Sequence, residues 1–326
     1  MPRVSVIIPV YGVERYIERC AVSLFEQTLE DMEIIFVDDC SKDSSIEVLQ
    51  NVLSRYPNRK SQTNIVHHTT NQGLPVARQT GLKYATGEYI AHCDSDDWVD
   101  INMYMMMYQK AKMEGADIVT CGYYQGDENI RNTRYVEDFK DKDSMIAAML
   151  THSTPVSVWN KLIKRSLYSD DDIVYPRNNF GEDFALMIQL VNRSRVFAHI
   201  NMPLYYYYSN QSSITKQRTP ESLYKNWKDM SINTQIVLDY LDKEGENIMF
   251  ETEIKILKEE CRSLLLPIMG MPGNRELYLS QYPDLTYSIT DLLKKEISLY
   301  AGRFWLTRLG LYRLGAKIKN KIIRNK

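Results

Sequence analysis

The sequence predicts an α/β protein in which helices cover both faces of a parallel sheet. Two observations lead to this prediction. Four short runs of β-branched and aromatic residues occur in the first 100 positions, and helix-like stretches with apolar residues every three or four positions separate them. The runs are apolar at consecutive positions, which is typical of parallel strands that are buried on both faces.

The elements alternate along this first part of the chain. The predicted strands are residues 4–9, 33–38, 64–68 and 88–93, and the predicted helices between them are residues 16–27, 44–53 and 74–84. Ser41 or Asp43 can cap the second helix through a side-chain oxygen. Pro75 suits the first turn of the third helix, because no N–H is required at that position.

The rest of the chain has a mixed pattern that becomes helical after Thr219. Strands are predicted at residues 116–124 and 204–215, a hairpin arm at 129–136, and helices at 103–107, at 144–150 and from Glu182 onward. Three longer helices are predicted at residues 221–243, 250–266 and 287–300. We therefore expect an α/β domain over residues 1–219, a helical appendage over 220–302 and a basic tail over 303–326.

The composition limits the possible functions. The 40 basic and 42 acidic residues nearly balance, which argues against a nucleic-acid-binding protein, because such proteins need a basic surface. The five cysteines form no CxxC pair and no signal sequence opens the chain, so we expect reduced thiols and a cytoplasmic protein. No window supplies the roughly twenty apolar residues that a membrane-spanning helix needs.

Polar side chains gather where the predicted strands end. Residues 90–98, IAHCDSDDW, place three carboxylates within four positions. Such a cluster is costly unless a cation lies within it, so a bound divalent metal is one interpretation and a solvated acidic turn is the other. Tyr11 and Asp39 follow the first two strands, and ligands of open α/β sheets bind beyond this edge. Neither GxGxxG nor a P-loop motif follows the first strand.

Three ordered segments resemble the family 2 glycosyltransferases. They are VSVIIPVYGVERYIERC with the following EIIFVDDCSKDSS, then NQGLPVARQTGLKYATGEYIAHCDSDDW, and GED before a helix. The resemblance covers roughly residues 1–210. It implies a GT-A fold, which is a Rossmann-like mixed sheet with helices on both faces, and transfer of a sugar from a nucleotide sugar with inversion. It also implies nucleotide-sugar binding in residues 1–100 and an acceptor side in residues 101–219.

The resemblance assigns several residues to the nucleotide. Pro9 and Tyr11 match residues that shape the nucleotide pocket, with the Tyr11 ring against the base. Asp39 matches a carboxylate that accepts a hydrogen bond from the uracil N–H, and an ionised carboxylate is a pure acceptor that disfavours cytosine. Arg78 matches an arginine near the nucleotide, where its planar fork suits a phosphate. Alternatively, Arg78 pairs with an aspartate of the DxD motif.

The DxD motif of the family matches residues 94–96. Asp96 is expected to bind Mn²⁺ or Mg²⁺ directly, and Asp94 to lie nearer the ribose or to reach the metal through water, because these hard cations prefer oxygen ligands and neutralise a diphosphate. Ser95 belongs to the same donor-binding segment. Asp97 is expected to cap the next helix or to support the site.

The ED pair of the family matches Glu182 and Asp183. The resemblance makes Asp183 the general base that removes the proton of the acceptor hydroxyl. Alternatively, both carboxylates only complement the positive end of the helix that they open. Glu182 and Trp159 are weaker candidates for the acceptor side, and Trp159 is equally expected to be buried in the core.

The sequence departs from the family pattern at two positions. Cys40 replaces a glycine, and its Cβ disfavours a left-handed backbone, so a differently shaped turn is expected. Gln79 replaces the more usual asparagine. Four histidines that lie on or beside predicted strands show no metal-ligand spacing and are expected in the core or at strand edges. They are His67, His68, His92 and His199.

The tail, residues 303–326, contains eight basic residues and no acidic residue. Its apolar residues recur at near-helical spacing, which indicates a helix lying on an anionic membrane surface. They are Trp305, Leu306, Leu309, Tyr312 and Leu314. Such a protein would be peripheral on the inner face of the cytoplasmic membrane. The alternatives are docking on an acidic surface of the protein itself, or disorder.

The main hypothesis is an inverting glycosyltransferase that moves a sugar from a UDP-sugar to a hydroxyl of a glycan or lipid-linked acceptor, in the synthesis of bacterial surface polysaccharide. Two alternatives stay open. One is a metal-dependent hydrolase of nucleotide sugars, and the other is a non-catalytic scaffold that binds them.

Overall fold

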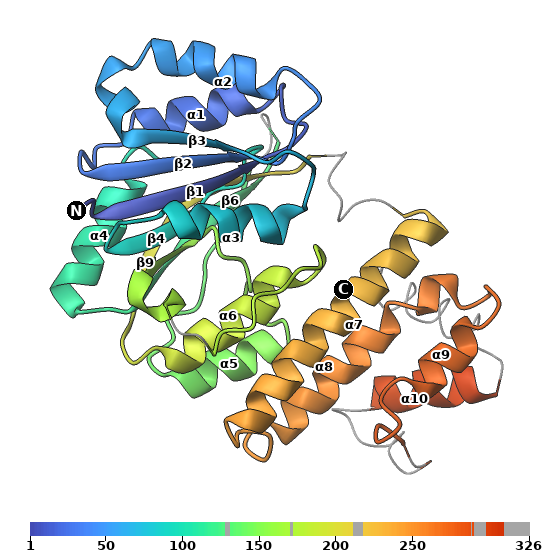
Figure 1. Cartoon of the computed structure of the whole chain (residues 1–326). Helices are drawn as coiled ribbons and strands as arrows, with labels where there is room; N and C mark the ends of the chain where they lie inside the picture. Colours follow the sequence, from blue (N-terminus) through green and yellow to red (C-terminus); the bar gives the residue numbers. More distant parts are fainter. Residues whose placement is uncertain (128–130, 170–171, 211–217, 288, 290–297, 310–326) are drawn as a thin grey trace. The chain divides into compact units, whose positions relative to one another are not determined.

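The computed structural model describes residues 1–127, 131–169, 172–210, 218–287, 289 and 298–309. The chain divides into two compact units, Met1–Ser213 and Ile214–Lys326. The first unit contains the sheet, and the second contains helices (Figure 1).

The strands of the first unit are β1 Val4–Val10, β2 Met32–Asp38, β3 Thr63–His67, β4 Tyr89–His92, β5 Trp98–Val99, β6 Ile118–Gly126, β7 Arg131–Arg134, β8 Lys161–Lys164 and β9 Phe197–Tyr208. Its helices are α1 Ile17–Phe25, α2 Ser45–Ser54, α3 Leu74–Tyr84, α4 Met103–Glu114, α5 Lys142–Leu150 and α6 Glu182–Arg193, with 3-10 turns η1 Pro57–Gln62 and η2 Arg165–Tyr168.

The predicted elements of the first 100 residues are confirmed. The strong alternation of strand and helix periods places each of their ends within about two residues of the observed one. The hairpin arm is also confirmed, because β7 pairs antiparallel with β6. The strand β9 begins at Phe197, earlier than predicted, and residues 211–215 of the prediction lie outside the described residues. The short strands β5 and β8 were not predicted.

The sheet is mixed, as the resemblance implies. Its order is β3-β2-β1-β4-β8-β6-β9-β5, with β7 beside β6. The four strands β3, β2, β1 and β4 are parallel, whereas β8 runs antiparallel between β4 and β6. The parallel arrangement predicted for the strands of the first 100 residues is therefore found in β1 to β4, and β6 and β9 also pair parallel to each other. β2 and β4 lie on opposite sides of β1, so the order in which the chain adds strands changes direction at β1. Ligands of such sheets bind at this point, beyond the carboxyl ends of the strands.

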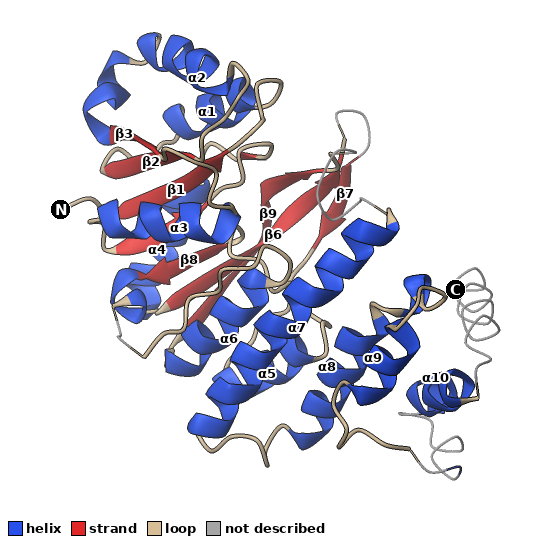
Figure 2. Ribbon diagram, turned by 45° about the vertical axis from the view of Figure 1, so that its right-hand side comes forward, coloured by secondary structure: helices blue, strands red, loops and turns tan. Residues whose placement is uncertain are grey.

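Helices cover both faces of the sheet (Figure 2). Val6 and Ile8 of β1 belong to a buried cluster that also contains Ile17 of α1 and Met107 of α4, so the predicted helix at residues 103–107 does pack on the sheet. Ile7 points to the other face, where α3 lies so close that a Cβ on Gly81 would come 2.3 Å from Ile7 Cγ2. The small residue at this position allows the close contact of helix and strand.

Two loop predictions can be compared with the backbone. The N-cap position of α2 is Ser44, whose side chain makes no capping hydrogen bond, so neither Ser41 nor Asp43 is the cap residue. Asp43 still binds the first turn, because the N–H of Ser45 donates to Asp43 Oδ1 at 3.2 Å. Cys40 has a φ of 62°, which is left-handed. The turn thus keeps a backbone conformation that the Cys40 Cβ makes unfavourable, and the expectation that the Cβ would exclude this conformation is wrong.

The second unit consists of α7 Pro220–Lys243, α8 Glu251–Ser263, η4 Leu266–Ile268, α9 Asn274–Ser280 and α10 Ser298–Arg308. The first two predicted helices are confirmed, and the Thr219 side chain caps α7 by accepting from the Ser222 N–H. The helix α9 was not predicted. Most of the third predicted helix, residues 287–300, lies outside the described residues, and α10 covers its end.

The first residues of the basic tail are part of α10. Phe304 and Thr307 are buried within the second unit, whereas Leu309 is exposed. The expected boundary at residue 303 therefore falls inside a helix, and Tyr312 and Leu314 lie outside the described residues. None of the helices in the described ranges has both the length and the apolar character that a bilayer span requires.

The packing of α3 on β1 gives a first testable prediction. We expect Gly81→Ala to lower the free energy of unfolding by about 1–3 kcal/mol, because the new methyl group overlaps Ile7, although alanine favours helices. Denaturant unfolding of the single variants and of the double variant Ile7→Ala/Gly81→Ala measures this. Additive effects of the two substitutions would contradict the proposed overlap.

Candidate active site

Arg78 joins the two acidic motifs that the sequence singled out. This residue of α3 is only 4% exposed. Its Nη2 donates to Asp94 Oδ1 at 2.7 Å, and its Nη1 donates to Glu182 Oε1 at 2.5 Å and to Asp183 Oδ1. Asp94 follows β4, whereas Glu182 and Asp183 open α6. One guanidinium therefore binds carboxylates that are nearly ninety positions apart in the chain.

Three carboxylates surround one guanidinium, and the pKa values of these groups reflect the excess of negative charge. Burial raises the pKa of Glu182 well above its usual range, and the charge of Asp183 adds to the effect. Burial also raises the pKa of Asp94, although Arg78 opposes the shift. Burial alone would lower the pKa of Arg78, but the three carboxylates together raise it. The cluster thus favours a further positive charge.

The other two aspartates of the acidic stretch have different surroundings. Asp97 is 1% exposed, and its oxygens accept from the Tyr205 hydroxyl and the Tyr208 N–H, both at 2.7 Å. It therefore attaches the end of β4 to β9 and does not cap α4. Asp96 Oδ2 accepts from Asn210 Nδ2 at 3.2 Å, and burial raises its pKa. Of the three, only Asp94 and Asp96 remain partly accessible.

Asp39 organises the loop that precedes α3. Its Oδ1 accepts from His68 Nδ1 at 2.7 Å and from the Gln72 N–H at 2.8 Å, and its Oδ2 accepts from the Gly73 N–H at 2.8 Å. A carboxylate oxygen has two lone pairs, so these contacts leave Oδ2 room for one more donor. The backbone of Gly73 has a φ of 90°, a conformation that glycine adopts readily because it has no Cβ.

The remaining donor candidates lie at the carboxyl ends of β1 and β4. Pro9 is buried within β1 beside Val37, and Tyr11 directly after the strand is 50% exposed. Ser95 is 6% exposed between Asp94 and Asp96. The structure therefore brings these residues, with Asp39, to the edge where β1 and β4 adjoin. The exposed ring of Tyr11 offers an apolar surface at this edge.

Trp159 is part of an aromatic cluster in the first unit. It is 7% exposed, and its ring stacks on Tyr205 and Tyr207 with centroids 4.4 and 5.6 Å away. Trp159 therefore lies in the core, which is the alternative that the sequence left open.

Lys161, two residues after Trp159, is 1% exposed and interacts electrostatically with Asp183. The resemblance includes Lys161 as part of a segment, residues 159–161, near the acceptor side. Residue types gave no reason to expect a role for His68 or Asn210, because strand register brings them to the site.

The two partly accessible aspartates are the residues that could hold a metal ion. Within the ranges that the structure describes, no group of three or more His, Cys, Asp and Glu side chains has the geometry of a metal site. Two carboxylates nevertheless suit Mg²⁺ or Mn²⁺ when substrate phosphates and water supply the other ligands. The raised pKa values of Asp94 and Asp96 fit this chemistry, since a nearby cation would favour both charged forms.

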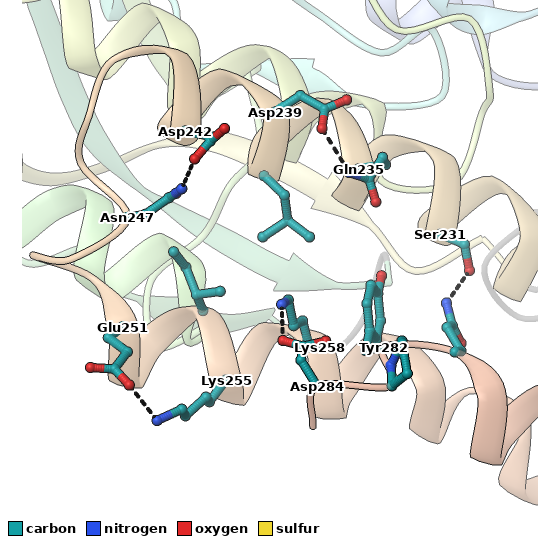
Figure 3. Close-up of a pocket in the computed structure, with 14 residues that line it drawn as sticks. Ser231, Gln235, Asp239, Asp242, Asn247, Glu251, Lys255, Lys258, Tyr282 and Asp284 are labelled. Atoms are coloured by element: carbon teal, nitrogen blue, oxygen red, sulfur yellow. Dashed lines mark hydrogen bonds and ion pairs between the residues drawn. The ribbon is translucent and has the colours of Figure 1, made fainter. Parts of the chain in front are cut away.

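A separate groove of about 740 Å³ lies in the second unit between α7 and α8 (Figure 3). Its two lysines are paired with carboxylates, Lys255 with Glu251 and Lys258 with Asp284, each at 2.6 Å. None of the candidate residues lines this groove. The chemistry that the sequence predicts therefore belongs to the edge of the sheet.

Comparison with known sequences agrees with the resemblance. The sequence pattern described as glycosyl transferase family 2 matches residues 5–185, which is more than half of the chain. The chain belongs to glycosyltransferase family 2. This family 2 glycosyltransferase is 31% identical over 226 residues to the uncharacterized glycosyltransferase EpsJ of Bacillus subtilis, an alignment that covers 66% of the chain and 64% of EpsJ. The chain thus spans just under two thirds of that relative.

Other relatives extend the comparison. This family 2 glycosyltransferase is 34% identical over 179 residues to a poly(ribitol-phosphate) β-glucosyltransferase of Bacillus spizizenii, covering 53% of the chain and 27% of the relative. Residues 1–349 of TarS from S. aureus, in complex with UDP-GlcNAc, have a TM-score of 0.68 at 16% identity, with 99% of this chain and 92% of TarS covered. The GT-A fold of this enzyme is thereby confirmed.

The central role of Arg78 gives a prediction for stability. We expect Arg78→Met to lower the free energy of unfolding by about 3–5 kcal/mol at pH 7, because the buried Glu182 and the partly buried Asp94 and Asp183 lose their counter-charge. A raised carboxyl pKa means that the folded state binds more protons than the unfolded state, so stability is lost as pH rises. The deficit should be larger at pH 8 than at pH 5. Denaturant unfolding at both values measures this, and an equal deficit would contradict the charge argument.

Proposed function

We propose that this enzyme is an inverting, metal-dependent glycosyltransferase that uses a UDP-sugar and glycosylates a hydroxyl of a glycan or lipid-linked acceptor. The observation that carries the proposal is the Arg78 cluster. It sets the DxD carboxylate Asp94 on one side of a guanidinium and the ED pair, Glu182 and Asp183, on the other. A sugar bound near this cluster would have a phosphate-binding group on one side and a base on the other.

The donor assignment rests on the edge of the sheet where β1 and β4 adjoin. Asp39 retains acceptor capacity on Oδ2 for the uracil N–H, and Tyr11 offers an exposed ring to the base. Structural neighbours support a nucleotide-sugar donor, since TarS is described with UDP and with UDP-GlcNAc. The mannosyltransferase PcManGT of Pyrobaculum calidifontis, with GDP-Man and Mn²⁺, has a TM-score of 0.56 at 14% identity, covering 98% of this chain and 87% of that chain. A carboxylate such as Asp39 can accept from an N–H of uracil or of guanine and disfavours only cytosine. We propose UDP because TarS, described with UDP and UDP-GlcNAc, has the higher TM-score of the two neighbours.

The proposed reaction forms one bond and breaks another. Asp183 accepts the proton of the acceptor hydroxyl as its oxygen attacks the anomeric carbon, and the bond from that carbon to the diphosphate oxygen breaks on the opposite face. Asp94 and Asp96 would hold Mn²⁺ or Mg²⁺, which would stabilise the charge of the departing UDP. The guanidinium of Arg78 keeps Asp183 oriented, since it binds Oδ1 and leaves Oδ2 toward the Val158 N–H.

The acceptor is proposed from the relatives. Several are glycosyltransferases of bacteria, and one acts, by its description, on poly(ribitol-phosphate). These relatives support a role in bacterial surface polysaccharide synthesis on the cytoplasmic side of the membrane. Membrane contact through residues 303–326 stays a prediction, and only residues 303–309 of that tail are described.

The general base is tested by substitution. We expect Asp183→Asn to lower kcat by about 10²–10⁴-fold, because the amide cannot accept the proton, while the affinity for the UDP-sugar changes little. Glu182→Gln is the matched control and should retain more activity. Transfer and release of UDP are measured with and without acceptor. Full transfer by Asp183→Asn would refute the assignment, UDP release that is independent of acceptor would favour the hydrolase, and tight binding without turnover would favour the scaffold.

The metal site is tested with two neighbouring aspartates. We expect Mn²⁺ and a UDP-sugar together to raise the Tm of the unmodified enzyme, and EDTA to abolish both this rise and the activity. Asp96→Asn should remove the rise with little change in the Tm of the free protein. Asp97→Asn should instead lower the Tm of the free protein, because Asp97 attaches β4 to β9. Identical behaviour of the two variants would contradict these assignments.

A further inference from the structure

Lys161, the first residue of β8, places a buried ammonium group near Asp183. The residue is 1% exposed, and Nζ donates to Ser157 O at 2.6 Å, to Asn160 Oδ1 at 2.9 Å and to Pro155 O at 3.1 Å. Three acceptors match the three protons of an ammonium group. The turn over residues 155–160 therefore folds around this one charge.

Asn160 completes the turn and fixes it to the sheet. It is fully buried, its Nδ2 donates to Cys121 O of β6 at 3.1 Å, and its Oδ1 also accepts from Ser157 Oγ at 3.0 Å. The backbone N–H of Lys161 donates to Val158 O at 3.2 Å. The position of Val158 is thus set from both sides by this network.

The turn touches the proposed base through a single backbone group. The Val158 N–H donates to Asp183 Oδ2 at 3.3 Å, while Arg78 binds Oδ1 of the same carboxylate. Each oxygen of Asp183 therefore has its own donor, and the two donors come from different elements. Without the turn, the carboxylate would be held from the Arg78 side alone.

We propose that Lys161 is a positioning residue for Asp183: its ammonium group shapes the turn that aims the Val158 N–H at the carboxylate. This inference rests on the proposed function, because it assumes that Asp183 is the base. Lys161 is assigned no direct contact with the substrate, because its three protons are already donated to the turn.

The hydrogen bonds of the ammonium group explain why a lysine lies at this buried position. Burial lowers the pKa of Lys161 to about 8, and the attraction of Asp183 only partly offsets the effect. An apolar side chain would leave the three acceptors in the turn without this donor, which is unfavourable for buried polar groups. Loss of the ammonium group is therefore expected to change the shape of the turn.

The test compares Lys161→Met with Lys164→Met. Lys164 lies in the same strand, but its half-exposed amine binds Asp117 at 3.2 Å, so its loss removes an equal charge away from Asp183. For Lys161→Met we expect kcat to fall about 10- to 100-fold, because a displaced base is less effective, with little change in KM for the UDP-sugar. The dissociation constant of the UDP-sugar, measured by direct binding, should also stay the same, so the loss appears in kcat alone. Lys164→Met should change none of these quantities.

A second variant keeps the test decisive if the methionine disturbs the turn. Lys161→Gln can still donate two hydrogen bonds to the turn, so kcat should fall less than in Lys161→Met, and KM should again change little. A folded variant of either kind with unchanged kcat would overturn the role of Lys161. Full activity of Asp183→Asn would instead overturn the proposed function, so the two failures are distinguishable.

Discussion

The contact of Arg78 with three carboxylates is the interaction on which the rest of the site depends. It connects α3, the end of β4 and the start of α6, which the chain reaches at widely separated points. A buried guanidinium is stable only when carboxylates surround it, and these carboxylates could not be buried together without it. One ion cluster therefore fixes the distance between the proposed donor and acceptor sides. It also leaves an excess of negative charge, which is what a metal-dependent transferase needs before its cation and diphosphate bind.

The mixed sheet explains how a second cation reaches Asp183. The antiparallel strand β8 lies between β4 and β6, so the turn before β8 comes back to the edge where β4 ends. Lys161 and the Val158 N–H thus approach Asp183 on one side, while Arg78 approaches from α3. A carboxylate held by two independent elements is oriented more firmly than one held by a single side chain, and orientation matters for the proposed role of Asp183 as a base.

The run of four tyrosines in β9 also follows from the sheet, because alternate residues of a strand point to opposite faces. Tyr205 and Tyr207 stack on Trp159, whereas Tyr206 stacks on Trp98, with centroids 5.2 Å apart. The Tyr205 hydroxyl donates to Asp97 and accepts from the Asp94 N–H at 3.1 Å. β9 therefore binds the side chain of Asp97 and leaves the side chains of Asp94 and Asp96 partly accessible. Three neighbouring aspartates thus have different surroundings.

The sequence by itself determined the strands and helices of the first 100 residues, the edge of the sheet that bears the polar side chains, and the family. Local periodicity and the geometry of parallel strands are enough for these conclusions. It could not show the antiparallel β8 or the partners of Asp39 and Asp97, because those contacts depend on strand register between distant segments. Only the tertiary structure decided that Arg78 pairs with both acidic motifs, that Trp159 is buried, and that Lys161 lies near Asp183. The physical reason is that the energy of a buried charge depends on every neighbour in space, whatever its separation in sequence.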